Sequence, residues 1–376
     1  MSPTPRNKPD EKALERARAG LRSLYVGDAL AMPVHWYYNP KDILKAFPGG
    51  IQKLEDAPAY HPSSIMPLHS TAKGGRGEQA AGGGREIVGE VILKGKRSFW
   101  GTPHQHYHQG MKAGENTLNA HCARLVTRSI TAAGGRYDKA RFLEDYIDFM
   151  TAEPPRHPDT YAESFHRGFF ANLESGYPPE RCGAVTHDTP SAGGLVMLAP
   201  IAIAAFLNGK TLESVQEVCR LHLFLTHPDD FLARIGDAYV KLLGDLLFRE
   251  TGEAPRQLIA DAARQSPGID LSRLASKASA DSDVIGGRYS TACYISDSWP
   301  GILYLAYQYA EDPKAALLAN TNLGGDNVHR GSVLGGILGL ATGRTVDEFF
   351  NQLKDRRAID EEISALINPL KEDGTE

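Results

Sequence analysis

Three histidines stand at alternate positions in one short segment: His104, His106 and His108. In an extended chain alternate side chains lie on one face, a spacing that can chelate a transition metal. Because alternate histidines are also common in loops as solvated or hydrogen-bonded residues, we favour that interpretation over a metal site. Histidine is the most frequent proton-transfer residue, so one or two of these side chains stay candidates for acid–base work or substrate binding.

A glycine-rich turn carries the second group of candidates. Gly324 and Gly325 precede Asp326, and a helix of small residues follows, so we expect a carboxylate on a tight turn at a helix N-terminus. His329 and Arg330 belong to the same span. Such a turn alone is weak evidence for a phosphate site, and a capped, closely packed helix is the plainer interpretation.

Helical periodicity dominates the chain that must position these residues. It predicts a first helix from Asp10 and further helices at residues 118–133, 138–152, 159–174, 192–207, 211–225, 229–250, 254–265, 297–311, 313–321, 332–342, 346–355 and 358–367. Strand patterns are few: residues 87–93 and 98–100 could pair as a hairpin that turns at residues 94–96.

The domain organisation follows from the same reading. A stretch from about residue 50 to 114 is rich in Gly, His, Pro and Ser and is predicted to be one long irregular insertion, of a kind that is usually functional or mobile. We expect residues 1–10 to form a flexible arm, residues 11–370 a single domain and residues 371–376 a flexible tail.

Composition and charge exclude several classes of protein. The 376 residues hold 41 Lys and Arg against 46 Asp and Glu, for a net charge of −5, so neither a nucleic-acid nor a membrane partner is expected. The four cysteines form no CxxC pair, and the polar N-terminus lacks the apolar core of a signal peptide. We therefore expect a cytoplasmic protein with a small-molecule substrate, and leave open whether it forms a homo-oligomer.

Two separated segments resemble the ADP-ribosylglycohydrolase family, which includes dinitrogenase reductase-activating glycohydrolase and the J1 crystallins. Residues 27–31, Gly-Asp-Ala-Leu-Ala, resemble the family's Gly-Asp-Ala-Leu-Gly segment, and residues 324–341 resemble its Gly-Gly-Asp turn and small-residue helix. Shorter matches lie between them at residues 193–200, 226–228 and 294–298. The matched order covers about residues 12–356 apart from the insertion, and it implies an all-α fold, a compact orthogonal helical bundle.

The resemblance also implies a site with altered ligands. Typical members hold two divalent cations, usually magnesium, through acidic and Thr ligands. Here residues 114–117 keep one acid of the first ligand segment, and the second segment keeps Asp326 but has Val328 in place of an acid; a further acidic position falls at His35. Because magnesium needs several oxygen ligands, we expect no paired magnesium site, no required cofactor and only weak magnesium binding.

If the family geometry holds, reactive side chains converge around the former metal site. We expect the catalytic acid–base groups to be Glu115, Asp326 and His329. The residues expected to bind the substrate are Asp28, His35, Asn116, Thr117, His106, His108, Asn327 and Arg330, of which the last would bind an anionic part. The stretch from about Ser70 to Gly114 is expected to border the pocket and act partly as a lid, the alternative being an oligomer contact.

Three functions fit these residues. The first is a hydrolase without paired magnesium that cleaves an N-glycosidic or other C–N bond of a small polar substrate, a bond type implied by the resemblance alone. The second is a metal-dependent ADP-ribosyl hydrolase with rebuilt ligands, and the third is an inactive binding or structural protein, for which the J1 crystallins are the precedent. Val328 is inert, but Glu115, His329 and His35 are reactive groups, which favours an enzyme.

Overall fold

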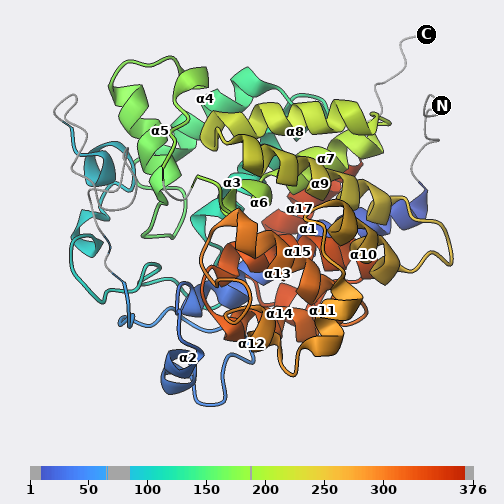
Figure 1. The fold of residues 1–376 in the computed structure, drawn as a ribbon. Helices are drawn as coiled ribbons and strands as arrows, with labels where there is room; N and C mark the ends of the chain where they lie inside the picture. Colours follow the sequence, from blue (N-terminus) through green and yellow to red (C-terminus); the bar gives the residue numbers. More distant parts are fainter. Residues whose placement is uncertain (1–9, 65, 67–84, 187–188, 369–376) are drawn as a thin grey trace, which may run out of the picture.

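Seventeen α-helices form the regular structure of the computed structural model, which describes residues 10–64, 66, 85–186 and 189–368 (Figure 1). They are α1 (Glu11–Ala31), α2 (Pro40–Ala46), α3 (Leu118–Ala132), α4 (Lys139–Met150), α5 (Ser164–Glu174), α6 (Gly193–Val196), α7 (Leu198–Leu207), α8 (Leu212–Thr226), α9 (Asp230–Leu247), α10 (Pro255–Gln265), α11 (Leu271–Lys277), α12 (Asp281–Val284), α13 (Ile295–Gln308), α14 (Pro313–Leu323), α15 (Asn327–Thr342), α16 (Asp347–Phe350) and α17 (Arg356–Ile367). In these described ranges β-pairing is limited to isolated bridges. The predicted all-α fold is confirmed.

Local signals in the sequence set many of the helix ends. The side chain of Asp10 accepts a hydrogen bond from the backbone N–H of Ala13 and caps α1, and Thr211 caps α8 in the same way. Gly343 ends α15 in the left-handed conformation that glycine adopts without strain. Most predicted helices therefore begin and end within a few residues of the observed ones, although α2, α11 and α12 were not predicted.

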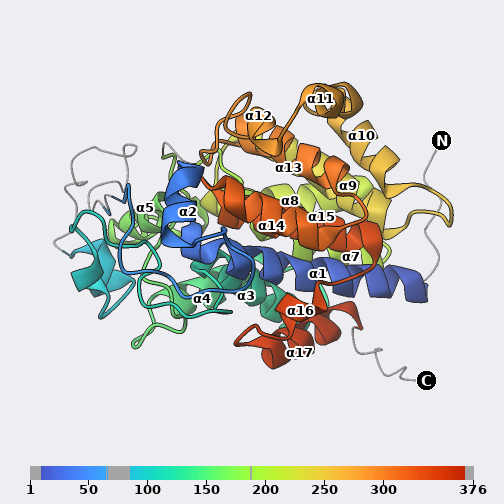
Figure 2. The same cartoon turned by 90° about the horizontal axis from the view of Figure 1, so that it is seen from below.

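Helices α1 and α15 form the centre of the fold and cross it side by side in opposite directions (Figures 1 and 2). Their backbones approach so closely that a methyl group at Gly335 would lie 2.2 Å from the carbonyl oxygen of Ser23. At Gly27 it would lie 2.1 Å from the carbonyl oxygen of Gly331. Glycine at these positions lets the two backbones touch, which brings the end of α1 beside the start of α15.

This close packing predicts opposite effects at two adjacent glycines of α15. We expect Gly335→Ala to lower the free energy of unfolding by about 1–3 kcal/mol, because its methyl group overlaps backbone that cannot move aside. Gly336→Ala is the matched control, since its nearest neighbour is the Tyr239 hydroxyl at 3.4 Å. This second variant should be neutral or gain about 0.5–1 kcal/mol from helix propensity. Urea denaturation of both variants measures the difference, and equal effects would contradict the packing.

The turn before α15 ties that helix to the segment after α1. Gly324 and Gly325 both have positive φ, and a methyl group on either would lie about 2 Å from a backbone oxygen, that of Tyr37 or Thr291. The N–H of Trp36 donates to the carbonyl of Gly325, and the N–H of Gly325 donates to the carbonyl of Tyr37. The residues on both sides of this junction are therefore held at fixed positions.

The hairpin expected between residues 87 and 100 is not formed. Gly89 has a φ of 101°, and hydrogen bonds from Gly89 N–H to Ile92 and from Ile92 N–H to Ile87 close a local turn in place of two extended strands. Burial of Val88, Val91 and Ile92 stabilises this turn, so alternating apolar residues here reflect a folded loop packed near α5. Residues 85–117 lie at the α5 end of the molecule in both views (Figures 1 and 2).

Several expectations concern residues that lie outside the described ranges. These are the flexible arm apart from Asp10, the tail at residues 371–376, and residues 70–84 of the expected lid. Among the described residues, no helix combines the length and the apolar character needed to cross a bilayer.

Candidate active site

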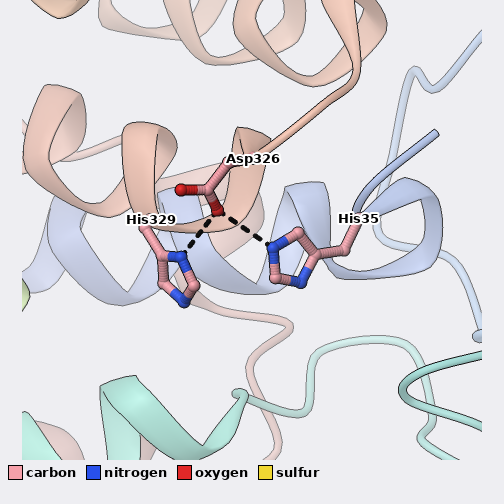
Figure 3. A group of neighbouring side chains, drawn as sticks. All are labelled: His35, Asp326 and His329. Carbon is pink, nitrogen blue, oxygen red and sulfur yellow. Dashed lines mark hydrogen bonds and ion pairs between the residues drawn. The ribbon is translucent and has the colours of Figure 1, made fainter. Parts of the chain in front are cut away.

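Three buried side chains from the two ends of the sequence meet where α1 ends and α15 begins. His35 Nε2 lies 3.1 Å from Oδ1 of Asp326, and His329 Nδ1 lies 2.6 Å from the same oxygen. Figure 3 shows both rings facing this oxygen, while the second carboxylate oxygen points away from them. That second oxygen, Oδ2, is buried and has no hydrogen-bond partner in the structure.

The contacts continue on the far side of His35. Its Nδ1 lies 2.7 Å from Nε2 of His108, and Nδ1 of His108 lies 2.7 Å from Oδ1 of Asp159. The other oxygen of Asp159 accepts from the N–H of Leu118, the first residue of α3, where a helix N-terminus favours a carboxylate. Asp159 therefore anchors His108, which in turn positions His35.

His329 connects the chain of contacts to a further carboxylate. Its Nε2 lies 3.1 Å from Oε1 of Glu163, which also accepts a hydrogen bond of 2.6 Å from the amide of Asn119. Glu163 precedes α5 but makes no capping bond to it, so its side chain reaches into the site. We call Asp159, His108, His35, Asp326, His329 and Glu163 the imidazole–carboxylate cluster.

The cluster borders a cavity of about 10 Å³. Its lining includes His35, His329 and Glu163, and the aromatic rings of Trp36 and Tyr161 form an apolar wall. Trp36 has a φ of 60°, unusual for a large side chain, and stacks on His35 with ring centroids 3.7 Å apart. Strained backbone of this kind is typical of functional sites. The volume is about that needed to hold one water molecule.

Burial and charge act in opposite directions on the ionisable groups. Burial lowers the pKa of His35 well below its ordinary value. Burial acts in the same direction on His329, but the carboxylates of Asp326 and Glu163 outweigh it and raise the pKa of that imidazole. Burial raises the pKa of Asp326, yet the neighbouring His329 and His35 outweigh it, so the pKa of this carboxyl falls below its usual range. Opposing shifts among adjacent groups are typical of proton-transfer sites.

The structure brings four of the predicted residues together and places Glu115 elsewhere. His35, His108, Asp326 and His329 are members of the cluster. Glu115 is half-buried, and its carboxylate accepts a hydrogen bond from the N–H of Lys112 in its own loop.

The polar atoms of the other predicted substrate residues form hydrogen bonds with backbone groups or with neighbouring side chains. Asp28 accepts bonds from the side chain and N–H of Thr117 and from the amide of Asn116. The guanidinium of Arg330 donates to Asn320 and to the carbonyl of Gly324. Asn327 donates to the carbonyls of Val34 and Thr321, and His106 Nε2 contacts the carbonyl of Pro33. Of this group only Thr117 borders the cavity.

The donor atoms do not fit the paired magnesium site implied by the family resemblance. Both oxygens of Asp28 already accept hydrogen bonds from Asn116 and Thr117, whose N–H and O–H groups face the carboxylate. Beside Asp326 the available donors are imidazole nitrogens, and Val328 is buried and apolar. Magnesium takes oxygen ligands almost exclusively, so this set is too poor in oxygen for two such ions.

Sequence reasoning missed Asp159, Glu163 and Asn119. Asp159 and Glu163 stand at the predicted start of a helix, where capping explained an acid well enough, and Asn119 lies inside a helical run. The available signal was an aspartate and a glutamate four residues apart. Nothing in the sequence indicated that either carboxylate would meet a histidine some 50 or more residues away.

Comparisons with known proteins agree with this architecture. The family model described as ADP-ribosylglycohydrolase matches residues 9–374. A solved structure called "ADP-ribosylglycohydrolase-related protein complex" is similar, with a TM-score of 0.57 and 16% identity, covering 96% of this chain and 99% of that one. The search of curated proteins returned no match. With a family model that spans nearly its whole length, the chain belongs to the ADP-ribosylglycohydrolase family, a family of hydrolases.

Proposed function

We propose that this chain is a hydrolase that cleaves an N-glycosidic or other C–N bond of a small polar substrate at the imidazole–carboxylate cluster. The observation that supports this most is the cavity bordered by His35, His329 and Glu163. Membership of the family supports hydrolysis as the reaction class. The type of bond is taken from the same family relationship.

Hydrolysis of a C–N bond needs one group that takes a proton from water and one that gives a proton to the leaving nitrogen. Glu163 and His329 are suited to these roles, because they adjoin each other and both border the cavity. Asn119 holds the carboxylate of Glu163, and Asp326 holds the ring of His329. The pair is thus oriented before substrate arrives, which is the main requirement for efficient proton transfer.

The size of the cavity limits what can enter it. A volume of about 10 Å³ is enough for the attacking water and little else. The body of the substrate must therefore lie outside it, where the rings of Trp36 and Tyr161 offer an apolar wall against a sugar or base. This arrangement favours a substrate that presents one bond to the cluster.

The experiment compares two glutamates that differ in position. Glu163→Gln should lower kcat by about 10²–10⁴-fold, because the amide cannot accept the proton of water. Glu115→Gln makes the same chemical change outside the cavity and should leave kcat unchanged. The assay is release of amine or reducing sugar from small N-glycosides and of ADP-ribose from ADP-ribosylated protein. Loss of activity in Glu115→Gln alone would place the chemistry at Glu115 and contradict the proposal.

A further inference from the structure

We propose that His35, Asp326 and His329 bind one divalent late first-row transition-metal ion of the zinc or iron type. One ligand atom of each residue lies within 4.8 Å of those of the other two. Ligand atoms about 2.0–2.2 Å from one ion lie about 2.8–3.6 Å apart in tetrahedral or octahedral geometry. The His35–Asp326 separation of 3.1 Å fits this range, and the His329–Asp326 contact of 2.6 Å needs to open slightly.

The number of ring protons on His108 and His35 is the second argument for a cation beside Asp326. Three contacts join Asp159, His108, His35 and Asp326 in a row, and each needs a proton between its two atoms. Two neutral imidazoles carry only two protons. If His108 donates to Asp159 and His35 donates to His108, then Nε2 of His35 presents a lone pair to the carboxylate of Asp326. Two lone pairs then face each other unless a third proton or a metal cation lies between them.

His329 presents the same problem from the other side. Its Nδ1 lies 2.6 Å from Oδ1 of Asp326, but the contact lacks hydrogen-bond geometry, and this nitrogen has no aligned partner. Nε2 lies 3.1 Å from Oε1 of Glu163 and 2.9 Å from the amide nitrogen of Asn119. If Nε2 carries the proton and donates it to Glu163, the lone pair of Nδ1 faces Asp326. Asp326 is fully buried and its Oδ2 has no hydrogen-bond partner in the structure, so its negative charge must be balanced either by a further proton on His329 or by a metal cation. A buried charge in this state calls for a compensating cation.

The surroundings match those of imidazole-bound metals in other proteins. A histidine ligand usually donates its second ring N–H to a carboxylate or similar acceptor. His329 has Glu163 in that position, and His35 has His108, which is backed by Asp159. The cavity beside the ring nitrogens leaves space for one water on the ion. Three protein ligands and one open position are typical of catalytic metal sites.

The chemistry of the donors selects the class of ion. Two imidazoles and one carboxylate suit zinc or iron, whereas magnesium and calcium prefer oxygen ligands. A bound ion of this class would lower the pKa of its water and so supply hydroxide near neutral pH. That catalytic role rests on the proposed function, whereas metal binding itself does not.

The test measures binding without substrate. Chelator-treated full-length protein is titrated with Zn²⁺ by calorimetry and with Co²⁺ by visible absorption, each with and without excess Mg²⁺. We expect one equivalent of Zn²⁺ per chain, retention in excess Mg²⁺, and Co²⁺ bands typical of nitrogen and oxygen ligands. His35→Ala and the isosteric Asp326→Asn should each weaken Zn²⁺ binding at least 100-fold, and circular dichroism verifies that they fold. The exposed His104→Ala is the control and should bind as the wild type does.

Several outcomes would overturn the proposal. One is the absence of saturable Zn²⁺ binding. Another is Zn²⁺ binding that persists in both His35→Ala and Asp326→Asn. A third is binding of two equivalents of Zn²⁺ per chain that excess Mg²⁺ displaces. Activity of the metal-free protein together with the absence of saturable Zn²⁺ binding would leave the proposed hydrolysis standing while this inference fails. Conversely, tight Zn²⁺ binding with no hydrolysis of any C–N substrate would support the metal site and count against the proposed function.

Discussion

Asp326→Asn should lower kcat by about 10³-fold or more, within the range that acid–base groups contribute. Oδ1 of Asp326 contacts the imidazoles of His35 and His329, and the substitution removes the negative charge that both rings face. The same oxygen would be a metal ligand, so the loss is expected whether or not an ion is bound. Steady-state kinetics with the substrate found for the wild-type protein measures the effect.

The loss of activity should occur without loss of the fold. Asp326 precedes α15 but its side chain makes no capping bond, so the helix does not depend on the carboxylate. Asp229→Asn is the matched control: Asp229 caps α9 outside the cluster, asparagine caps equally well, and kcat should stay unchanged. If Asp326→Asn kept wild-type kcat, the imidazole–carboxylate cluster would not be the active site.

Asp28→Ala should lower the free energy of unfolding by about 3 kcal/mol or more. The carboxylate of Asp28 is fully buried and accepts three hydrogen bonds, from Asn116 Nδ2, Thr117 N–H and Thr117 O–H. Removing it leaves these donors buried and unsatisfied, at about 1–3 kcal/mol for each group. These bonds hold residues 116 and 117 against α1 and so place the start of α3. The change is measured by urea denaturation.

An isosteric variant separates this structural role from substrate binding. Asp28→Asn keeps one oxygen acceptor and should lose clearly less stability than Asp28→Ala. The family resemblance implies instead that Asp28 binds the substrate. That role would be supported if either variant raised KM or lowered kcat while its urea midpoint matched the wild type.

Helix positions could be read from the sequence because they depend on local signals. The apolar stripe from Leu14 and the caps at Asp10 and Thr211 act over a few residues. The hairpin expected at residues 87–100 failed for a physical reason: alternation of apolar residues also arises in a loop that buries Val88 and Val91 around a positive-φ glycine. The central helix pair was also predictable in part, since the small residues of α15 indicated close approach by another element.

The site was predictable only where the family resemblance or a motif marked it. Asp326 and His329 follow a glycine turn, and His35 fell at an acidic position of the family. Glu115 was favoured by alignment, but the loop turns its carboxylate toward Lys112, outside the cavity. The carboxylates that do belong to the cluster include those of Asp159 and Glu163. Tertiary packing brings them to His108 and His329, and no local signal in the sequence encodes these contacts.

We propose a single imidazole–carboxylate centre where the family resemblance implies two magnesium ions. Anomalous diffraction from crystals grown with Zn²⁺, recorded on both sides of the zinc absorption edge, tests it most directly. We expect one anomalous peak within coordination distance of His35 Nε2, His329 Nδ1 and Asp326 Oδ1, and none beside Asp28. A pair of peaks bridged by carboxylates, or a peak that contacts neither imidazole, would contradict the claim.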